Sequence, residues 1–379
     1  MRKLISVVFL LFAVIGNSFC QELKLPDSIY SGEQGNFHVQ GIAIDRTKGF
    51  TYFSFTNKLV KTDLSGKLLG SVTGFIGHLG DIDINEKGDI YASLEYKNDA
   101  IGKGIKKELG IQNPGEDGFY IAIFDASKIT KPDMQADESD LLTTVFIKEA
   151  VNDYNAILKT ENTEILHRFA CSGIDGIAFA PAAGAPVNSK KFLYIAYGIY
   201  GDVNRNDNDN QVILKYDTGN WQKYARVLTQ GNLHQSGPKK PAGKYFVKTG
   251  NTRYGIQNLA YDETSGNLFA AVYKGAKPQY PNYDLFVIDM KKKPGTSSIS
   301  FGNESIKVQT LALLNAGLRD TSSGINGWHF KWGATGLCPI GNGRFYISHD
   351  KKTKAGVQST TIHQYRWTGE ATEPFILVN

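Results

Sequence analysis

Two histidines and two carboxylates stand at related points of a sequence pattern that recurs along the chain, and together they could perform acid–base chemistry. They are His38, His78, Glu95 and Asp175. Histidine is the usual proton donor or acceptor near neutral pH, and two carboxylates across a sugar suit glycoside hydrolysis. A His or Tyr base, with Lys or Arg neutralising a uronate, would suit β-elimination. We predict that these four residues are catalytic, and no spacing chooses between hydrolysis and elimination.

A second group of polar and aromatic residues lies near the same points of the pattern, and we predict that it binds substrate. Aromatic faces stack on sugar rings, although they also fill gaps between sheets. Polar groups buried where packing favours apolar residues must pair or meet water or a ligand. The predicted substrate-binding residues are Gln40, Lys97, Arg253, Tyr254, Gln257, His329, Lys331, Trp332 and Asp350.

The segment 202–210 alternates aspartate with asparagine and suggests a metal site. Carboxylate and amide oxygens at close spacing are the ligands that Ca²⁺ prefers. The predicted metal ligands are Asp202, Asn204, Asn206, Asp207 and Asp209. The segment lacks the Gly and Glu of an EF-hand loop, and Asp and Asn also favour solvated turns. Ca²⁺ is thus the one cofactor that the sequence suggests, and its role would be to order this loop.

The elements that position these residues are five copies of a strand–turn–strand pattern, clearest at 255–262 and 266–273. Each copy continues into a third strand and a less regular fourth strand. Alternating apolar residues, β-branched and aromatic enrichment, and Gly or Asn turns indicate strands throughout. Five four-stranded antiparallel units of the same order predict an all-β fold, a five-bladed β-propeller.

The copies align as follows. Innermost strands are predicted near 40–45, 80–85, 175–180, 257–262 and 335–340, and fourth strands at 68–72, 142–147, 224–228, 308–313 and 375–378. The third strand ends in a recurrent aspartate, which we interpret as a turn cap; the four residues are Asp63, Asp125, Asp217 and Asp289.

A short helix is predicted over 100–109. Residues 23–30 could pair beside the last blade, or the last blade could be complete without them. Long connections, among them 97–118 and 126–172, extend one face of the ring, where function usually resides.

The N-terminus predicts export. Residues 1–20 combine Arg2 and Lys3 with an apolar run too short to span a membrane, which is typical of a signal peptide. We expect a secreted or periplasmic protein; attachment of lipid at Cys20 is less favoured, because bulky Phe19 precedes it. Residues 21–379 are predicted to form a single propeller domain.

Charge and cysteine content limit the classes of partner that we expect for this protein. The formal net charge is +5 with acids and bases interspersed, so no basic stripe indicates nucleic acid binding. No other segment is apolar for long enough to cross a bilayer. We predict Cys171 and Cys338 to be free thiols, and we expect a monomer.

Segments 38–41, 77–82, 93–97 and 173–177 resemble a family of secreted bacterial β-propellers that carries no assigned activity. More loosely, the blades resemble the gluconolactonase/SMP-30 group, which holds a divalent metal on the axis through Glu, Asn and Asp. The equivalent positions here are Gln40, Gly80, Asp175, Gln257 and Thr335, which depart from that set. Five-bladed glycoside hydrolases share the blade count, but a fold does not fix a function.

Together these patterns predict an exported carbohydrate-active enzyme, a glycoside hydrolase or lyase, with its site at the axial mouth of the loop-rich face. Its ligand would be a small molecule or a glycan. The alternatives are a non-catalytic glycan- or protein-binding propeller and a metal-dependent lactonase-like hydrolase. The axial residues differ between copies, which favours one asymmetric site over repeated binding pockets.

Overall fold

The computed structural model describes residues 24–112, 115–137, 140–159, 164–301 and 304–378. The predicted signal peptide, residues 1–20, lies outside the described residues. None of the described helices is long and apolar enough to cross a membrane.

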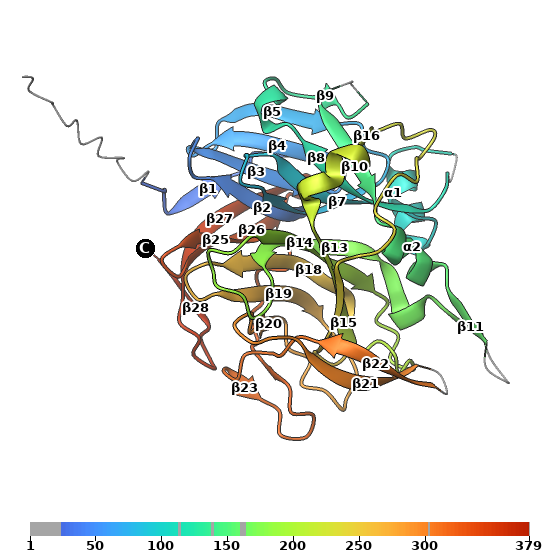
Figure 1. The fold of residues 1–379 in the computed structure, drawn as a ribbon. Coiled ribbons are helices and arrows are strands. Elements are labelled where there is room, and N and C mark those ends of the chain that lie inside the picture. Colours follow the sequence, from blue (N-terminus) through green and yellow to red (C-terminus); the bar gives the residue numbers. More distant parts are fainter. Residues whose placement is uncertain (1–23, 113–114, 138–139, 160–163, 302–303, 379) are drawn as a thin grey trace, which may run out of the picture.

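Five sheets surround a common axis and form the predicted five-bladed propeller (Figure 1). The innermost strands are β2 (Val39–Asp45), β6 (His78–Ile84), β13 (Cys171–Pro181), β18 (Thr252–Asp262) and β25 (Leu337–Gly341). The second strands are β3 (Phe50–Phe55), β7 (Ile90–Tyr96), β14 (Lys191–Ile199), β19 (Asn267–Lys274) and β26 (Arg344–Lys352). The third strands are β4 (Lys58–Asp63), β8 (Gly118–Phe124), β15 (Asn210–Tyr216), β20 (Leu285–Ile288) and β27 (Gln358–Trp367). Within each blade these three strands pair antiparallel.

The recurrent aspartates cap turns, as predicted. Asp63 accepts from the backbone N–H of Ser65 at 2.8 Å, and the other three accept from the N–H two residues ahead in the same way. An aspartate side chain satisfies backbone donors where the chain leaves a strand. This explains the recurrence without a catalytic role.

The outer strands follow the prediction in the first, second and fifth blades but not in the third and fourth. β5 (Leu68–Thr73), β10 (Leu142–Phe146) and β28 (Phe375–Leu377) lie where fourth strands were expected. The segment 224–228, predicted for the third blade, contains only β16 (Arg226–Val227), which pairs with β10 in the second blade. The third blade is completed instead by β17 (Gly243–Lys248).

The segment 308–313, predicted for the fourth blade, is also displaced. Its strand β22 (Glu304–Thr310) forms a hairpin with β21 (Gly295–Phe301) and pairs parallel with β17 of the third blade. The fourth sheet is left with β18, β19 and β20. Alternating apolar residues predict a strand but not which exposed edge it joins, which is why these two predictions were wrong.

The N-terminal segment closes the ring. β1 (Ser28–Tyr30) pairs antiparallel with β27, Ile29 lying opposite Ile362, while β28 pairs with the far end of β27. Figure 1 shows β1 beside the last blade. Strands near the two ends of the described chain therefore complete the fifth blade, and the first of the two alternatives for closure is confirmed.

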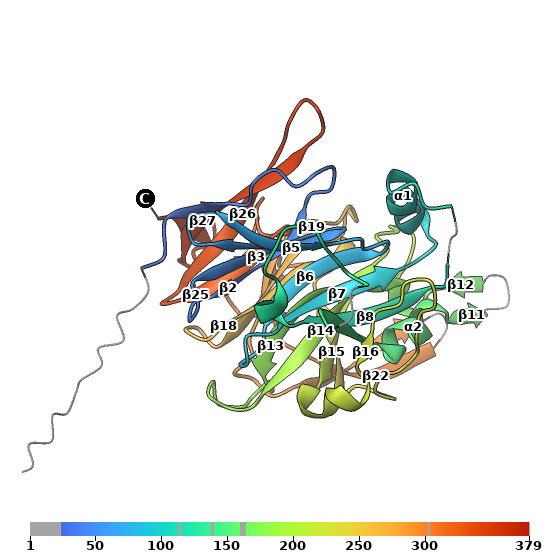
Figure 2. The same cartoon turned by 90° about the horizontal axis from the view of Figure 1, so that it is seen from above.

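The remaining elements are short. The predicted helix is α1 (Ala100–Glu108), and α2 (Lys148–Tyr154) lies in a connection where none was expected. Figure 2 shows α1 and the tip of the β26–β27 hairpin projecting on the same side of the ring. The other pieces are β9 (Met134–Gln135), β11 (Ile157–Lys159), β12 (Glu164–Leu166), β23 (Leu318–Arg319), β24 (Asn326–Gly327) and 3₁₀ turns at Ala126–Lys128, Arg168–Ala170 and Thr218–Lys223.

The apolar core lies between neighbouring blades. Phe179 of the third blade packs edge-on against Tyr91 of the second, with ring centroids 4.9 Å apart, and Phe269 and Phe345 join the fourth and fifth blades at the same distance. Such aromatic pairs add to the free energy gained by burial. Cys171 and Cys338 are free, as predicted.

Two polar side chains tie the innermost strands together on the axis. Asp81 of β6 is 2% exposed and accepts from the N–H groups of Ile82, Ile177 and Leu259 at 2.9–3.0 Å, so it joins three blades. Asn258 donates to the carbonyl of Gln40 and accepts from the N–H of Leu337, joining the fourth, first and fifth blades. Burial raises the pKa of Asp81, and its backbone donors act in the opposite direction.

We expect Asp81→Asn to destabilise the fold by about 1–3 kcal/mol, because the amide keeps one accepting oxygen and turns an NH₂ group toward a buried N–H. Chemical denaturation measures this free energy of unfolding. The matched control is Asp63→Asn at an exposed turn, where a change within about 0.5 kcal/mol is expected. Equal losses for the two variants would contradict the axial role of Asp81.

Candidate active site

One cavity of about 290 Å³ collects all four residues predicted to be catalytic. It opens at the axis between the first four blades and includes the first residue of β6, the end of β7 and the middle of β13. It is lined by His38, Gln40, His78, Glu95, Lys97, Ile101, Ser172, Asp175, Gly198, Tyr254, Gln257 and Tyr273. Four of the predicted substrate-binding residues, Gln40, Lys97, Tyr254 and Gln257, are thus also present. The repeat brings these groups together because equivalent strand ends of a propeller meet around its axis.

A buried carboxylate fixes His78 and Lys97. Glu95 is 4% exposed; its Oε2 lies 2.9 Å from Lys97 Nζ and 3.4 Å from His78 Nδ1, while Oε1 accepts from the N–H of Ile174 at 2.6 Å. Lys97 Nζ also donates to the carbonyl of Ser172 at 2.9 Å. Both oxygens of Glu95 and the ammonium group of Lys97 are therefore engaged by the protein itself.

The charges of this pair are mutually stabilised. Burial acts to raise the pKa of Glu95, but Lys97 and His78 hold it below its ordinary value. Burial likewise acts to lower the pKa of Lys97, but Glu95 and Asp99 raise it to about 12. Glycine at position 173 leaves space for the carboxylate of Glu95, because a Cβ there would lie 1.8 Å from Glu95 Oε1. The φ of Gly173, +128°, also disfavours any other residue.

Asp175 presents a buried oxygen without a partner. Its Oδ2 accepts from Gln257 Nε2 at 2.7 Å, whereas Oδ1 has no hydrogen bond among the described residues. Oδ1 lies against Gly80, where any Cβ would come within 2.6 Å of it. Burial raises the pKa of Asp175 to about 7, with His78 and Lys97 opposing the rise and Glu95 adding to it. Near neutral pH this carboxyl group can therefore donate a proton.

The two histidines differ in their surroundings. His78 contacts Glu95 through Nδ1, and its Nε2 has no hydrogen bond among the described residues. Burial and neighbouring His78 lower the pKa of His38 to about 4, so His38 is neutral at physiological pH. The Nε2 atoms of His38 and Gln40 lie 3.3 Å apart, and Gln40 also donates to Thr56. His78 is thus the better-placed base, because a carboxylate orients its ring.

Two tyrosines border the cavity. Tyr254 is 40% exposed and meets Tyr273 edge to face with ring centroids 6.1 Å apart. Tyr254 has a φ of 66°, an uncommon value for a bulky residue, and its carbonyl accepts from Gln257. Burial, then Asp350 and Asp175, raise the pKa of Tyr273. These rings offer apolar faces and edges to a ligand.

Ile101 and Ser172 line the cavity and were not among the sequence-based candidates. Ser172 directly precedes the glycine of the third repeat, so its position could have been found by alignment of the repeats. Ile101 lies on α1, which has no counterpart in the other blades, and no repeat signal could have placed it.

The other predicted binding residues do not line this cavity. Arg253 is exposed on β18, and His329 lies 3.8 Å from Asp284. Trp332 stacks on His349 with ring centroids 3.9 Å apart, and Lys331 lies over Trp332. Asp350 is exposed on β26. The fifth blade therefore contributes no residue to the described lining.

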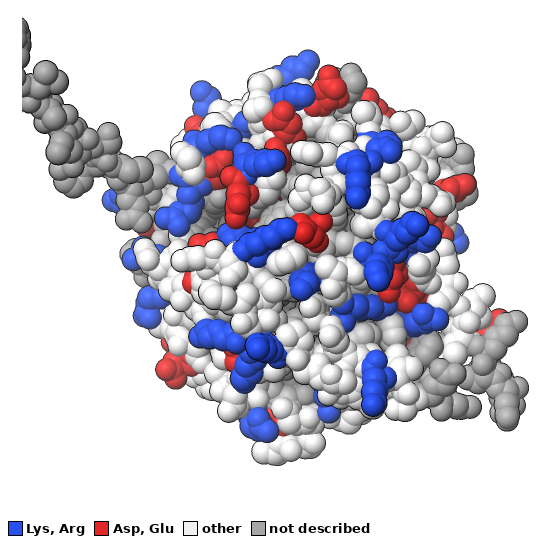
Figure 3. Space-filling model, in the orientation of Figure 1, with Lys and Arg blue, Asp and Glu red and all other residues white. Residues whose placement is uncertain are grey.

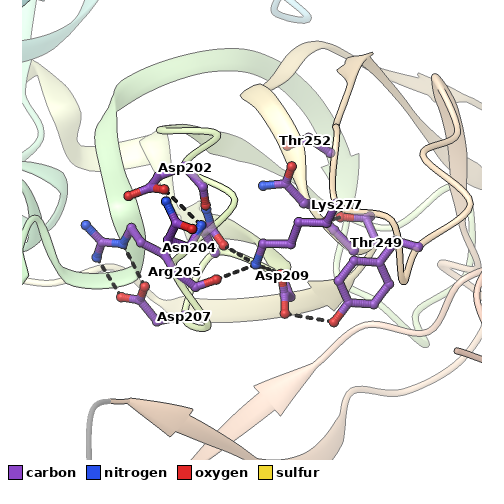
Figure 4. Close-up of polar contacts among 12 residues, drawn as sticks. Asp202, Asn204, Arg205, Asp207, Asp209, Thr249, Thr252 and Lys277 are labelled. Carbon is purple, nitrogen blue, oxygen red and sulfur yellow. Dashed lines mark hydrogen bonds and ion pairs between the residues drawn. The ribbon is translucent and has the colours of Figure 1, made fainter.

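The Asp/Asn segment does not have the arrangement of a calcium site (Figure 4). Asp207 is paired with Arg205 through two contacts of 2.8 Å, and Asp209 is held by Lys277 Nζ at 2.5 Å and by the hydroxyl of Tyr280 at 2.7 Å. The side chain of Asp202 caps the N–H of Asn204, and Asn204 and Asn206 are exposed. No group of three or more His, Cys, Asp or Glu residues in the described part of the chain could hold a metal ion.

Lys277 supplies the positive charge that was expected from calcium. The residue is 1% exposed, and its ammonium group donates to the carbonyl of Arg205, to Asn208 Oδ1 at 2.8 Å and to Asp209. A lysine ammonium group among oxygen atoms can balance buried negative charge, as a metal cation would. The sequence could not predict this, because Lys277 comes from the connection after β19, almost 70 residues along the chain from Asn208.

We expect Lys277→Met to lower the free energy of unfolding by about 1–3 kcal/mol, because Asp209 and Asn208 then lose a buried donor. Wild-type protein should keep its Tm when EDTA is added and when Ca²⁺ is restored. Lys274→Met, at an exposed neighbouring position, is the matched control. A fall in the wild-type Tm in chelator would contradict the substitution of Lys277 for a metal ion.

Basic and acidic side chains alternate over the surface shown in Figure 3, without a continuous stripe of one sign.

No family model matches the chain, and no curated protein matches it. Solved structures with a similar fold include a soluble aldose sugar dehydrogenase from Escherichia coli, 10% identical with a TM-score of 0.36 over 88% of this chain and 98% of that one. A gluconolactonase from Xanthomonas campestris is 10% identical with a TM-score of 0.34 over 86% and 72%. The PQQ domain of a pyranose dehydrogenase from Coprinopsis cinerea is 12% identical with a TM-score of 0.33 over 85% and 81%. Propellers of the gluconolactonase type, which the sequence loosely resembles, are thus among the similar solved structures, and at these values the likeness carries no information about substrate.

Proposed function

We propose that the axial cavity is the active site of a hydrolase that acts on a small sugar-like substrate by acid–base catalysis. The observation that supports this most is that an oriented histidine, His78, and a buried carboxyl group, Asp175, line one cavity, and that one oxygen of Asp175 has no hydrogen-bond partner among the described residues. Perturbed titratable groups that converge in a cavity are candidates for catalysis. The volume of about 290 Å³ lies at the small end of ligand sites and suits one ring rather than a long oligosaccharide.

In the proposed reaction, His78 Nε2 accepts a proton from a water molecule that attacks the substrate carbon. Asp175 donates its proton to the departing oxygen, so that one carbon–oxygen bond forms and one breaks. The products are an acid or hemiacetal and an alcohol, and the proton returns from His78 to Asp175 through solvent. Glu95 orients His78 and stabilises its positive charge.

Because both oxygens of Glu95 are already bound by other groups of the protein, we favour hydrolysis of an ester-type bond, such as that of a sugar lactone, over hydrolysis of an acetal. Retaining and inverting glycosidases need a second carboxylate free to act as nucleophile or base. Here both Glu95 oxygens are occupied by Lys97, His78 and the N–H of Ile174. The two-carboxylate glycosidase mechanism predicted from the sequence therefore has less support than attack by water activated at His78.

The test is to screen residues 21–379 against sugar lactones, aryl esters of sugars and aryl glycosides, with His78→Ala as comparison. We expect turnover of the ester-type substrates, at least about tenfold less in His78→Ala, with partial recovery in added imidazole. Unchanged turnover in His78→Ala would remove it as the base. Binding of sugars without turnover of any substrate would replace the hydrolase with a binding propeller.

The acid role of Asp175 predicts an alkaline limit to activity. Its pKa of about 7 means that the proton-donating form is present below pH 7 and is lost as the pH rises through that value. We therefore expect kcat/KM to fall above about pH 7 with the loss of one proton. This fall in kcat/KM above pH 7 should be absent from the residual activity of Asp175→Asn. If the variant shows the same fall as the wild type, another group is responsible for it.

A further inference from the structure

The ionic groups of the axial cavity already neutralise one another. The ammonium group of Lys97 is the one Lys or Arg cation among the described residues that line it, and its contacts are with Glu95, with the carbonyl of Ser172 and, at 3.9 Å, with Asp99. Its charge is balanced inside the protein rather than offered to a ligand.

No Lys or Arg without a protein partner remains among the described lining residues to receive an anion. Glu95 is ionised beside Lys97, His38 is uncharged, and Asp175 adds a second carboxyl group, which becomes negative as the pH rises through its pKa of about 7. Arg253 and Lys331, two of the three Lys and Arg residues predicted from the sequence to bind substrate, lie outside the lining. A carboxylated or phosphorylated ligand would therefore bury its charge with no compensating cation, which costs free energy.

The rest of the lining offers hydrogen bonds and aromatic faces. Gln40 and Gln257 present side-chain amides, Ser172 a hydroxyl, and Asp175 a buried oxygen without a partner among the described residues. Tyr254 and Tyr273 meet at nearly a right angle, with an interplanar angle of 88°. Hydroxyl groups on an uncharged ring match such a set, since each can both donate and accept.

We infer that the cavity selects neutral, hydroxyl-rich ring compounds and rejects their carboxylated or phosphorylated counterparts. This inference rests on the proposed function for the sugar-like class of ligand, and it adds the charge of that ligand. It also replaces uronate elimination, one of the two reactions that the sequence left open. An acid formed by hydrolysis of a neutral lactone would be an anion in the same cavity, and the lack of a free cation there favours release of this product.

The experiment compares ligands that differ at C6, where one member of each pair carries a hydroxymethyl group and the other a carboxylate. Binding of methyl β-glucoside against methyl β-glucuronide, and of methyl β-galactoside against methyl β-galacturonide, is measured by calorimetry on residues 21–379. We expect the neutral member of each pair to bind about tenfold tighter or more, because the carboxylate of the uronide would be buried without a cation partner. Tighter binding of either uronide would overturn the inference.

Ile101 offers a place to reverse the selection. It lines the cavity from α1 and is partly exposed, so a lysine there can place its ammonium group at the rim. Ile101→Lys should reduce the preference for the neutral ligand about tenfold, and less in 0.5 M salt, since screening weakens rim charges. Ile101→Leu, the control, should leave the preference unchanged. Equal effects of the two variants would mean that charge does not set selection, which would contradict the inference.

The outcomes separate this inference from the proposed function. If uronides bind more tightly and their esters are hydrolysed in a manner that depends on His78, the results support acid–base hydrolysis and contradict selection for neutral ligands. If neutral sugars bind but no ester is hydrolysed, the results support selection for neutral ligands and contradict the hydrolase proposal. Binding of neither series would overturn both.

Discussion

The Asp175→Asn variant is expected to lose about 10²–10⁴-fold in kcat on its best ester-type substrate, the range typical of a missing general acid. Asparagine has nearly the same shape and can still accept from Gln257 Nε2, which lies 2.7 Å from Oδ2 in the wild type. What it cannot do is deliver a proton to the departing oxygen. Steady-state kinetics at pH 6 measure the loss, because the wild-type acid is protonated there.

Stability distinguishes this catalytic loss from damage to the fold. The pKa of Asp175 in the folded protein, about 7, lies above that of an unfolded aspartate, about 3.9. The folded chain therefore binds more protons between these values, and the contribution of Asp175 to stability declines as the pH rises from about 4 to 7. Asp175→Asn carries no such charge, so its Tm at pH 8 should equal or exceed that of the wild type. A large fall in Tm together with activity would assign Asp175 to structure.

A substrate with a good leaving group gives a further control. An activated aryl ester needs little protonation of its departing oxygen, so Asp175→Asn should lose much less activity on it than on an alkyl ester. His78→Ala should lose activity on both, since both need an activated water. Equal losses of Asp175→Asn on the two esters would contradict its role as proton donor.

The repeat in the sequence was sufficient to predict both the ring and the meeting of its central residues. His38 and His78 occupy equivalent positions, so once five blades were recognised, geometry required them to approach the axis together. Glu95 and Asp175 followed from the same alignment, and all four line the cavity. This success depends on the inner strands, which are determined by local pattern and by position around the axis.

The outer strands and the connections could not be predicted in the same way. β17 and β22 join the third blade although the pattern had assigned the fourth strand of that blade to 224–228. Edge pairing is decided by tertiary contacts that leave no periodic signal. The same holds for Lys277, whose ammonium group comes from a distant connection and contacts Asn208 and Asp209 in the calcium-like run of Asp and Asn. Ionic partners from separate connections are visible only in three dimensions.

Glu95→Gln is expected to destabilise the protein by about 3–5 kcal/mol, the usual effect of removing one partner from a buried ion pair. Lys97, with a side chain 6% exposed, would keep its charge beside an uncharged amide. The same change frees the His78 ring, since the glutamine side chain would offer it a weaker acceptor or an NH₂ group. Both the free energy of unfolding and kcat should therefore fall, and denaturant titration with steady-state kinetics measures them.

The double variant Glu95→Gln/Lys97→Met separates the two effects of Glu95. Replacing the unpaired ammonium group of Lys97 by an apolar side chain removes the uncompensated charge. The double variant should therefore recover part of the lost free energy of unfolding, since removing both members of a buried ion pair often changes stability little. Activity should not recover with it, because His78 still lacks the carboxylate that orients its ring. Recovery of both together would mean that Glu95 acts only by balancing Lys97, and that the orientation of His78 has some other cause.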